Sequence, residues 1–494
     1  MLKKVAQHTV IYAIGNIGIR AASFVLIPLF THTLPQDEFG LLATLLMVNQ
    51  VLLVFMNVGM RDTIVRFFQE SKETGSIGAL LGSCLLMSIG MGCTVTVVSL
   101  LFLVPFFQDL LHTEAVFHYL LLTCLITLAQ CLCMQLMSYY RSDSRPVAFL
   151  VSGVGCAFLL LGLNALFLTT FRQGVYGALF AHLCTYGVTF VVLFSHVILK
   201  TGLSVSRAAF RNALHFGFPL VLSQISDISI IALPTIFLSR YHGLRAVAIF
   251  SVGQKLAQLL GPFLVLPFQM ALEPMVFNNL DHKELRAKLS KMLTYFVLVF
   301  LVAAVCFMAF SRVLLLLAAP QSYDGAAIVM AALLPTAFFL GLANFGRVLL
   351  HIRLRTDITG GFGILFACLS LVFYNILIAK YAILGALVSA NTIWMLQGSI
   401  MLVCGLRIFN IPVDIRRLTI AGFGLLMVWA LFIVSPSLTN VSFYAMICLL
   451  IVVGGTILKL SRFLTEQEKS TVCDLMEQYK CILRRYIAPK GPTA

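Results

Sequence analysis

The sequence predicts an all-α protein that crosses a membrane about fourteen times. Hydrophobic residues make up 60% of its 494 residues, charged residues make up only 11%, and the mean hydropathy is +0.99. A soluble domain carries about 25% charged residues, so this chain could not cover itself with a solvated surface. Apolar stretches of about 20 residues, the length that a spanning helix needs, follow one another along the chain.

Short polar connections separate these apolar stretches and fix the expected spans. The first span follows Lys3 and Lys4, has no small-residue cleavage site and runs into a second span, so we interpret it as a retained helix and not as a signal peptide. We expect spans at 9–30, 39–60, 77–104, 116–140, 147–170, 175–198, 215–239, 247–277, 292–318, 327–350, 359–379, 382–404, 419–435 and 441–459.

The distribution of the basic residues predicts the orientation. A net charge of +15 could suggest a nucleic-acid partner, but the charges lie in the short connections between apolar spans. With the N-terminus in the cytoplasm, most basic residues fall on the cytoplasmic side, whereas the opposite loops hold only Arg172, Arg240, Arg245 and Lys380. This bias follows the positive-inside rule and requires an even number of spans. We therefore expect both termini in the cytoplasm and no nucleic-acid partner.

A weak internal repeat predicts two lobes. Leu26-Ile-Pro-Leu-Phe30 in the first span is matched by Ala232-Leu-Pro-Thr-Ile-Phe237 in the seventh, and a longer connection separates the two halves. Repeated lobes with a site between them are a common arrangement in transporters. We expect the following parts: an N-terminal lobe at 1–200, a C-terminal lobe at 201–405, two accessory helices at 406–460 and a cytoplasmic amphipathic tail at 461–494.

The tail combines apolar residues at helical spacing with Lys480, Arg484 and Arg485. Such a helix lies along the inner leaflet, with its cations toward anionic lipid headgroups. Membrane lipids are therefore expected partners. The alternative is a helix that binds a protein partner.

Polar residues inside the expected spans are the candidates for function, because a charge in the membrane core is costly and usually faces a cavity or a partner. Arg20 lies near the middle of the first span and shares a helical face with Asn16. In the eighth span, Lys255 shares a face with Gln258. A cavity with one cation from each lobe would suit an anion that is too polar to cross lipid, such as a phosphate or a pyrophosphate.

Further polar residues lie in other spans. Asn344 and Arg347 in the tenth span are additional candidates for the cavity, and Asp227 in the seventh is a candidate for coupling to a cation or a proton. Alternatively, Asp227 is a structural partner that pairs with Arg20 or Lys255. Neutral polar groups are also found in the spans, including Asn49, Gln50, Gln130, Asn391 and Gln397.

Signatures of enzymes are missing from the sequence. It contains no H-E-x-x-H, Walker or G-x-S-x-G pattern, and its histidines and cysteines form no recognisable set of metal ligands. We therefore expect a transporter with no catalytic residues, no cofactor and no metal. Without a Walker motif, transport would draw on an ion gradient, the membrane potential or a partner.

The N-terminal stretch resembles a known family. The residues that carry the resemblance are Ala13-Ile-Gly-Asn16, Arg20, Ile27-Pro-Leu-Phe-Thr31, Leu34-Pro-Gln-Asp-Glu-Phe-Gly40, Gly59-Met-Arg61 and Ile64-Val-Arg66-Phe67. They are similar to the O-antigen and exopolysaccharide flippases of the multidrug/oligosaccharidyl-lipid/polysaccharide exporter (MOP) superfamily.

The resemblance implies two six-helix lobes around a central cavity, followed by two accessory helices. It also implies that an undecaprenyl-pyrophosphate-linked oligosaccharide moves from the cytoplasmic to the periplasmic leaflet of the bacterial inner membrane, for surface polysaccharide such as lipopolysaccharide or exopolysaccharide. Arg20 occupies a first-span position at which a cavity cation meets the pyrophosphate, and Lys255 is the candidate for its counterpart in the eighth span.

Two other functions stay open. A multidrug antiporter of the same fold would rely on intramembrane acids to meet cationic substrates, and here Asp227 and Glu273 are the candidates. A membrane-embedded glycan polymerase or ligase would need larger outer loops than this sequence provides.

Overall fold

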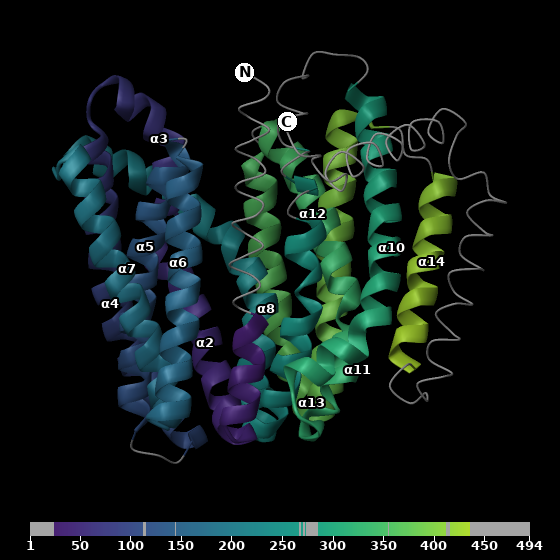
Figure 1. Ribbon diagram of the computed structural model, residues 1–494. Helices are drawn as coiled ribbons and strands as arrows, with labels where there is room; N and C mark the ends of the chain where they lie inside the picture. Colours follow the sequence, from purple (N-terminus) through teal and green to yellow (C-terminus); the bar gives the residue numbers. More distant parts are fainter. Residues whose placement is uncertain are drawn as a thin grey trace, which may run out of the picture. The chain divides into compact units, whose positions relative to one another are not determined.

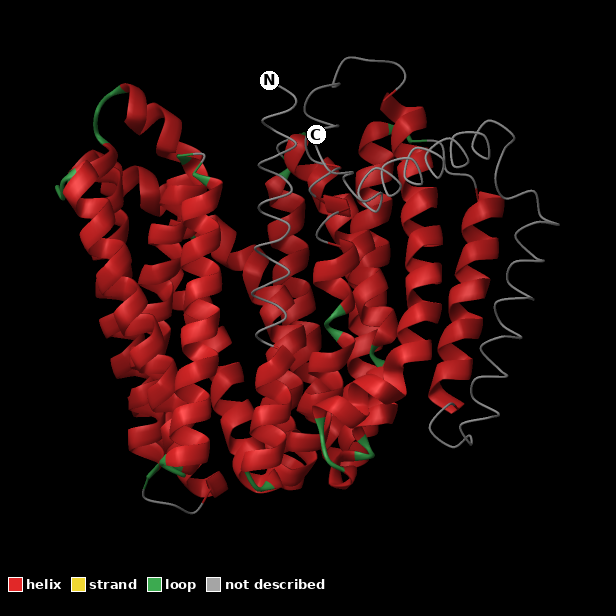
Figure 2. Cartoon of the chain, viewed as in Figure 1, coloured by secondary structure: helices red, strands yellow, loops and turns green. Residues whose placement is uncertain are grey.

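A computed structural model describes residues 24–111, 115–143, 145–265, 268–269, 272, 285–353, 355–411 and 415–434. Within these ranges the chain is helical and contains no strand (Figure 2), which confirms the all-α fold class. Eight helices of this part are long and apolar enough to cross a membrane. The total of fourteen stays a prediction, because the first span is described only in part, and the span at 441–459 and the tail at 461–494 lie outside the described residues.

The helices before residue 202 follow the expected spans closely, and in Figure 1 α4 to α7 lie side by side. After the helix Phe24–Thr33, they are α2 (Gln36–Asn57), α3 (Met60–Glu73), α4 (Ile77–Leu111), α5 (Val116–Ser142), α6 (Pro146–Ala165), a π turn at Leu166–Thr170 and α7 (Gly174–Thr201).

The second half of the chain contains longer helices that include two sharp bends. The helices are α8 (Arg207–Ala257), α10 (Leu285–Ala318), α11 (Ala326–Ala332), α12 (Leu334–Ile352), α13 (Thr356–Phe409) and α14 (Ile415–Val434). The backbone leaves the helical region at Gly243 in α8 and at Ala382 in α13. Each of these helices is therefore two consecutive helices, as the expected boundaries at 239–247 and 379–382 predicted.

A short amphipathic helix, α3, follows α2 after a turn at Val58 and Gly59. Both residues have positive φ, 45° and 71°, so the chain reverses the helical twist at this point. Met60, Ile64 and Phe68 recur every four residues and are buried, whereas the charged residues of α3 lie on its other faces.

Contacts divide the chain into two compact units. Unit 1 consists of Met1–Met292 and Phe310–Pro412, and unit 2 consists of Leu293–Ala309 and Val413–Ala494. Within unit 2, the middle of α10 packs on α14, where the rings of Phe307 and Phe432 meet edge to face with centroids 6.2 Å apart. The division into lobes at 1–200 and 201–405 stays a prediction.

Unit 1 contains two hydrophobic cores that share α8. The first core joins α3, α4, α5 and α7 with Ala213 and Val221 from the beginning of α8. The second core joins α11, α12 and α13 with Ile230 and Phe250 from the remainder of α8. The helix therefore passes from one core to the other between residues 221 and 230.

Pro234 lies just beyond this crossing and leaves the carbonyl of Ile230, four residues earlier, without a helical donor, because proline has no N–H. Side chains from elsewhere in the fold donate to this carbonyl and to the next one. The hydroxyl of Tyr374 donates to the carbonyl of Ile230 at 2.9 Å, and Nε2 of Gln254 donates to the carbonyl of Ile231 at 3.0 Å.

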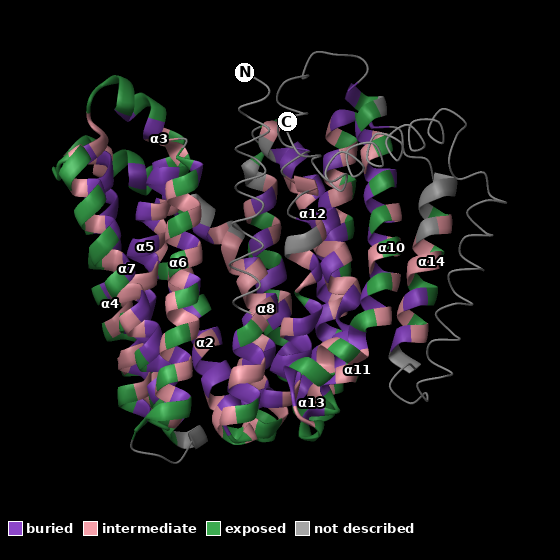
Figure 3. Ribbon diagram, viewed as in Figure 1, coloured by how far each residue is buried: buried purple, intermediate pink, exposed green. Residues whose placement is uncertain are grey.

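The helix surfaces turned away from the cores are apolar. Figure 3 shows α4 exposed along much of its length, and Leu101 and Phe102 on it are 66% and 72% exposed. A water-soluble protein rarely exposes continuous apolar surface of this extent. Together with the helix lengths, this surface identifies a multi-pass membrane protein.

Candidate functional site

A cavity of about 450 Å³ lies within unit 1. Its walls come from the helix Phe24–Thr33, from α2, α5, α6 and α7, and from the middle and the end of α8 with the two residues that follow it. Two of the predicted site residues, Lys255 and Gln258, line it, together with Asn49, Gln50 and Gln130. Polar residues that the sequence places in three different spans are thus brought to one cavity.

Lys255 is a half-buried cation whose partners are aromatic rings. Its Nζ lies 6.0 Å from the ring centroid of Phe30 and 5.4 Å from that of Phe39. Among the described residues, no carboxylate lies within ion-pair distance of Nζ, and Nζ makes no hydrogen bond to any of these residues. Ring faces stabilise a cation without neutralising it. The positive charge of Lys255 is therefore available to an anionic ligand.

Asp227 and Arg347 form an ion pair instead. The guanidinium of Arg347 on α12 contacts both carboxylate oxygens of Asp227 on α8, each at 2.6 Å. Nε2 of Gln397 on α13 donates a further hydrogen bond of 2.9 Å to Oδ1. The side chains of Arg347 and Asp227 are 18% and 29% exposed. A bidentate pair of this kind neutralises both charges, so neither residue presents a free charge as Lys255 does.

The remaining predicted residues are placed as follows. Asn344 is half-buried on α12, one helical turn before Arg347, and does not line the cavity. Arg20 and Asn16 lie outside the described residues. Asn49 lines the cavity, but its amide donates to Oγ1 of Thr127 at 3.0 Å and so helps to join α2 to α5.

Two cavity residues, His182 and Tyr186 on α7, were not predicted as site residues. They lie four residues apart, so they share one face of the helix. Their polar groups in the otherwise apolar span at 175–198 were the signal that could have found them. A histidine in such a span is as often a packing residue as a ligand, and the sequence does not show which helix it faces.

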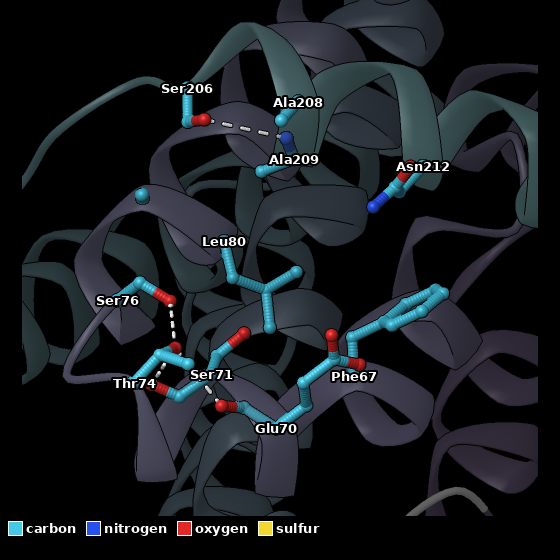
Figure 4. A pocket seen from close by; sticks show the side chains of 11 residues that line it. Phe67, Glu70, Ser71, Thr74, Ser76, Leu80, Ser206, Ala208, Ala209 and Asn212 are labelled. Atoms are coloured by element: carbon cyan, nitrogen blue, oxygen red, sulfur yellow. Dashed lines mark hydrogen bonds between the residues drawn. The ribbon is translucent and has the colours of Figure 1, made fainter.

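A second pocket, of about 170 Å³, lies where the beginning of α8 meets α3 and α4 (Figure 4). Three of its hydroxyl groups make local hydrogen bonds. Oγ1 of Thr74 and Oγ of Ser76 are 2.7 Å apart, and the hydroxyl of Ser206 caps α8 by accepting from the N–H of Ala209. The carboxylate of Glu70 and the amide of Asn212 also line this pocket, and we assign no ligand to it.

Comparison with known proteins identifies the family. The model of the polysaccharide biosynthesis protein family matches residues 5–280. No curated protein matches the sequence significantly. The fold resembles that of the lipid II flippase MurJ in an inward closed conformation, with a TM-score of 0.65, 13% identity, and coverage of 92% of this chain and 98% of that chain.

Two multidrug transporters are similar as well. An inward-facing multidrug resistance MATE family transporter of the MOP superfamily has a TM-score of 0.59 and 17% identity, with coverage of 81% of this chain and 98% of that chain. The MATE transporter VcmN of Vibrio cholerae, in a mutant form, has a TM-score of 0.58 and 18% identity, with coverage of 83% and 97%. Because the family model covers more than half of the sequence, the chain belongs to the polysaccharide biosynthesis protein family, and it has the fold of the MATE and MurJ transporters of the MOP superfamily.

Proposed function

We propose that the protein is a flippase that moves a lipid-linked oligosaccharide from the cytoplasmic to the periplasmic leaflet of the bacterial inner membrane. The observation that carries the proposal is the cation Lys255, which pairs with no described carboxylate, in a cavity whose described lining contains no Asp or Glu. The pyrophosphate of an undecaprenyl-pyrophosphate-linked saccharide is an anion that such a cavity would bind. Family membership and the likeness to a lipid II flippase support the same substrate class.

A multidrug antiporter is the alternative, and the state of Asp227 argues against it. A cationic drug needs a free acid in the membrane. Of the two candidates, Glu273 lies outside the described residues, and the charge of Asp227 is neutralised by Arg347. The cavity has positive charge on its described wall, which would repel such a substrate.

The other predicted site residues complete the proposal. We propose that Arg20 supplies a second cation to the pyrophosphate and that Asn16 and Gln258 add hydrogen bonds. In this scheme the Asp227–Arg347 pair, with Asn344 one turn away, keeps α8 and α12 of the C-terminal lobe together during alternating access. Both termini lie in the cytoplasm, and partner enzymes of glycan assembly, such as a glycan polymerase or a glycosyltransferase, bind the protein on that side.

Replacement of Lys255 in a deletion strain tests the proposal. Lys255→Met should abolish export of the surface glycan and cause lipid-linked units to accumulate in the cytoplasmic leaflet, whereas Lys255→Arg should keep most of the export. Lys200→Met is a matched control, because Lys200 is exposed and contacts His196 at the end of α7. Wild-type export by Lys255→Met would refute the anion site, and single glycan units reaching the surface of the deletion strain would indicate a polymerase.

A further inference from the structure

The cavity contains a group of neutral polar side chains that the proposed anion site does not use. They are Gln50 on α2, Gln130 on α5, and His182 and Tyr186 on α7, which together we call the neutral wall. All four belong to helices that precede α8, whereas Lys255 belongs to α8. We infer that the neutral wall binds the first sugar of the substrate, while Lys255 binds the phosphate groups that carry this sugar. The inference rests on the function proposed above and specifies how its substrate lies in the cavity.

His182 presents a hydrogen-bond acceptor to the cavity. Its side chain is 6% exposed, and Nδ1 lies 2.8 Å from the carbonyl oxygen of Ala178. A carbonyl can only accept, so the proton of the ring is on Nδ1 and Nε2 carries a lone pair. This tautomer of the neutral imidazole offers an acceptor on the edge of the ring away from Ala178.

The free ring nitrogen distinguishes a sugar from a phosphate. The lone pair of Nε2 repels a phosphate oxygen, which has no proton to donate once it is ionised. A sugar hydroxyl or the N–H of an acetamido group can donate to Nε2 instead. His182 therefore selects for the saccharide part of a lipid-linked substrate.

The rest of the neutral wall fits the same part. Tyr186 lies one helical turn after His182, with the ring centroids 6.5 Å apart and the planes inclined by 52°. Its ring offers an apolar face for the C–H groups of a pyranose, and its hydroxyl offers a polar edge. The amides of Gln50 and Gln130 make no hydrogen bond to other described residues, and each can both donate and accept.

The two parts of the cavity thus separate by charge. The neutral wall has no formal charge with which to hold a pyrophosphate, whereas Lys255 has the charge and lies over the rings of Phe30 and Phe39. A substrate that carries a sugar directly on its phosphate would occupy both parts at once. A bare polyprenyl pyrophosphate would occupy only the part at Lys255.

Binding of two probes to the purified full-length protein in nanodiscs tests this assignment. The probes are undecaprenyl pyrophosphate and undecaprenyl-pyrophosphate-linked N-acetylglucosamine. His182→Phe keeps a ring of similar size but removes the acceptor, so the sugar-bearing probe should bind about fivefold more weakly and the bare probe within about twofold of wild type. Lys255→Met should weaken both probes by about tenfold or more. His196→Phe on the same helix is the matched control and should change neither.

The outcomes separate the inference from the proposed function. Equal weakening of both probes by His182→Phe, or no weakening of either, would overturn the assignment of the first sugar. Unchanged binding of both probes to Lys255→Met would instead overturn the anion site and, with it, the proposed function. Tyr186→Phe removes only a hydroxyl and provides the same selective test if His182→Phe does not give folded protein.

Discussion

At the scale of single residues, the contrast between Lys255 and Asp227 decides how the charges in the described spans act. Both residues lie on α8, but only Asp227 pairs with an opposite charge among the described residues. Arg347 on α12 supplies this charge, and Gln397 on α13 adds a hydrogen bond. Removal of one member of a buried pair leaves the other charge without compensation. Loss of one partner should therefore lower the free energy of unfolding by more than the intact pair itself contributes.

The replacement Arg347→Met should destabilise the protein by up to about 3 kcal/mol, because Asp227 then remains charged in an apolar surrounding. The double variant Arg347→Met/Asp227→Asn should recover much of this loss. Thermal unfolding of the detergent-solubilised variants measures the difference. Equal losses in the single and the double variant would show that the ion pair does not hold the three helices together.

Asp143 at the end of α5 provides a test outside the spans. Its carboxylate is 2.8 Å from Nζ of Lys72 and 2.6 Å from Nε of Arg145. Burial alone would raise the pKa of Asp143, but the hydrogen bonds and the charges of Lys72 and Arg145 outweigh burial and hold this pKa below its ordinary value. The group therefore adds stability above its unfolded-state pKa of about 3.9, and this stability is lost as the pH falls through the lower folded-state pKa.

The variant Asp143→Asn removes the titrating group, so its Tm at neutral pH should lie below that of the wild type. The difference between the two proteins should shrink as the pH falls below about 4, where the wild-type carboxylate becomes protonated. A series of thermal melts across this pH range gives the comparison. A difference that stays constant down to the lowest pH would contradict the role assigned to the carboxylate.

The candidate site could be predicted from the sequence only in part. Polar residues in apolar spans identified Lys255 and Gln258, which line the cavity, because the cost of burying a charge in a membrane holds whatever the fold. Their partners could not be predicted in this way. Arg347 pairs with Asp227 instead of lining the cavity, and His182 lines the cavity. Neither placement could be predicted, because each depends on how helices distant in sequence are rotated against one another.

At the scale of elements, α8 is the helix on which the two cores of unit 1 depend. Its beginning packs against the turn between α2 and α3, where Gly217 and Gly59 let the two backbones approach closely. A methyl group at Gly217 would overlap the carbonyl oxygen of Val58 and lie 2.7 Å from Cε of Met60. The close crossing is therefore possible only because these positions have no side chain.

Gly217→Ala should destabilise the protein by at least about 2 kcal/mol, because a backbone atom and not a flexible side chain stands in the way. Gly187→Ala is a matched control on α7, since a methyl group there meets nothing within 4 Å. The control should be neutral or more stable by about 0.5–1 kcal/mol, the usual gain for this change inside a helix. Thermal unfolding of both variants checks the prediction, and equal Tm values for the two would contradict the close crossing.

The boundaries of the helices were more accessible from the sequence than the backbone geometry of their bends. Apolar length placed both ends of α5 and α7 within three residues and the beginning of α4 at Ile77, because the thickness of the membrane fixes how long a span must be. The sharp turn at Ala382 was not predictable from residue type, since φ is 51° at a residue with a side chain. The packing of α13 on α8 and α12 accompanies this turn, and such contacts have no local signal.

At the scale of the molecule, two groups of contacts in unit 1 join connections for which the sequence predicts opposite sides of the membrane. Lys72 and Arg145 both pair with Asp143 at the end where the sequence predicts cytoplasm. At the other end, the hydroxyl of Thr31 donates to the carbonyl of Ala318 at 2.7 Å, and the rings of Phe39 and Tyr323 meet edge to face. These groups agree with an even number of spans between connections of the same side.

The second of these groups closes the predicted periplasmic end between the first two helices and the connection from α10 to α11. Nε2 of Gln36 donates to the carbonyl of Ser322 at 2.6 Å, although the two residues are 286 positions apart in the chain. In a flippase that works by alternating access, this closure has to open so that the substrate can leave. A covalent link across it should therefore stop transport without affecting the folded state.

The pair Gln36→Cys/Ser322→Cys tests this requirement. Treatment of whole cells with a short bifunctional thiol reagent should join the two cysteines and block export of the surface glycan, while a reagent that a reducing agent cleaves should allow export to resume. Each single cysteine variant serves as a control for modification without a link. The native cysteines, most of which lie in apolar spans, are present in the single and the double variants alike. Full export by the linked protein would show that this closure does not have to open, and transport would then require a different exit from the cavity at Lys255.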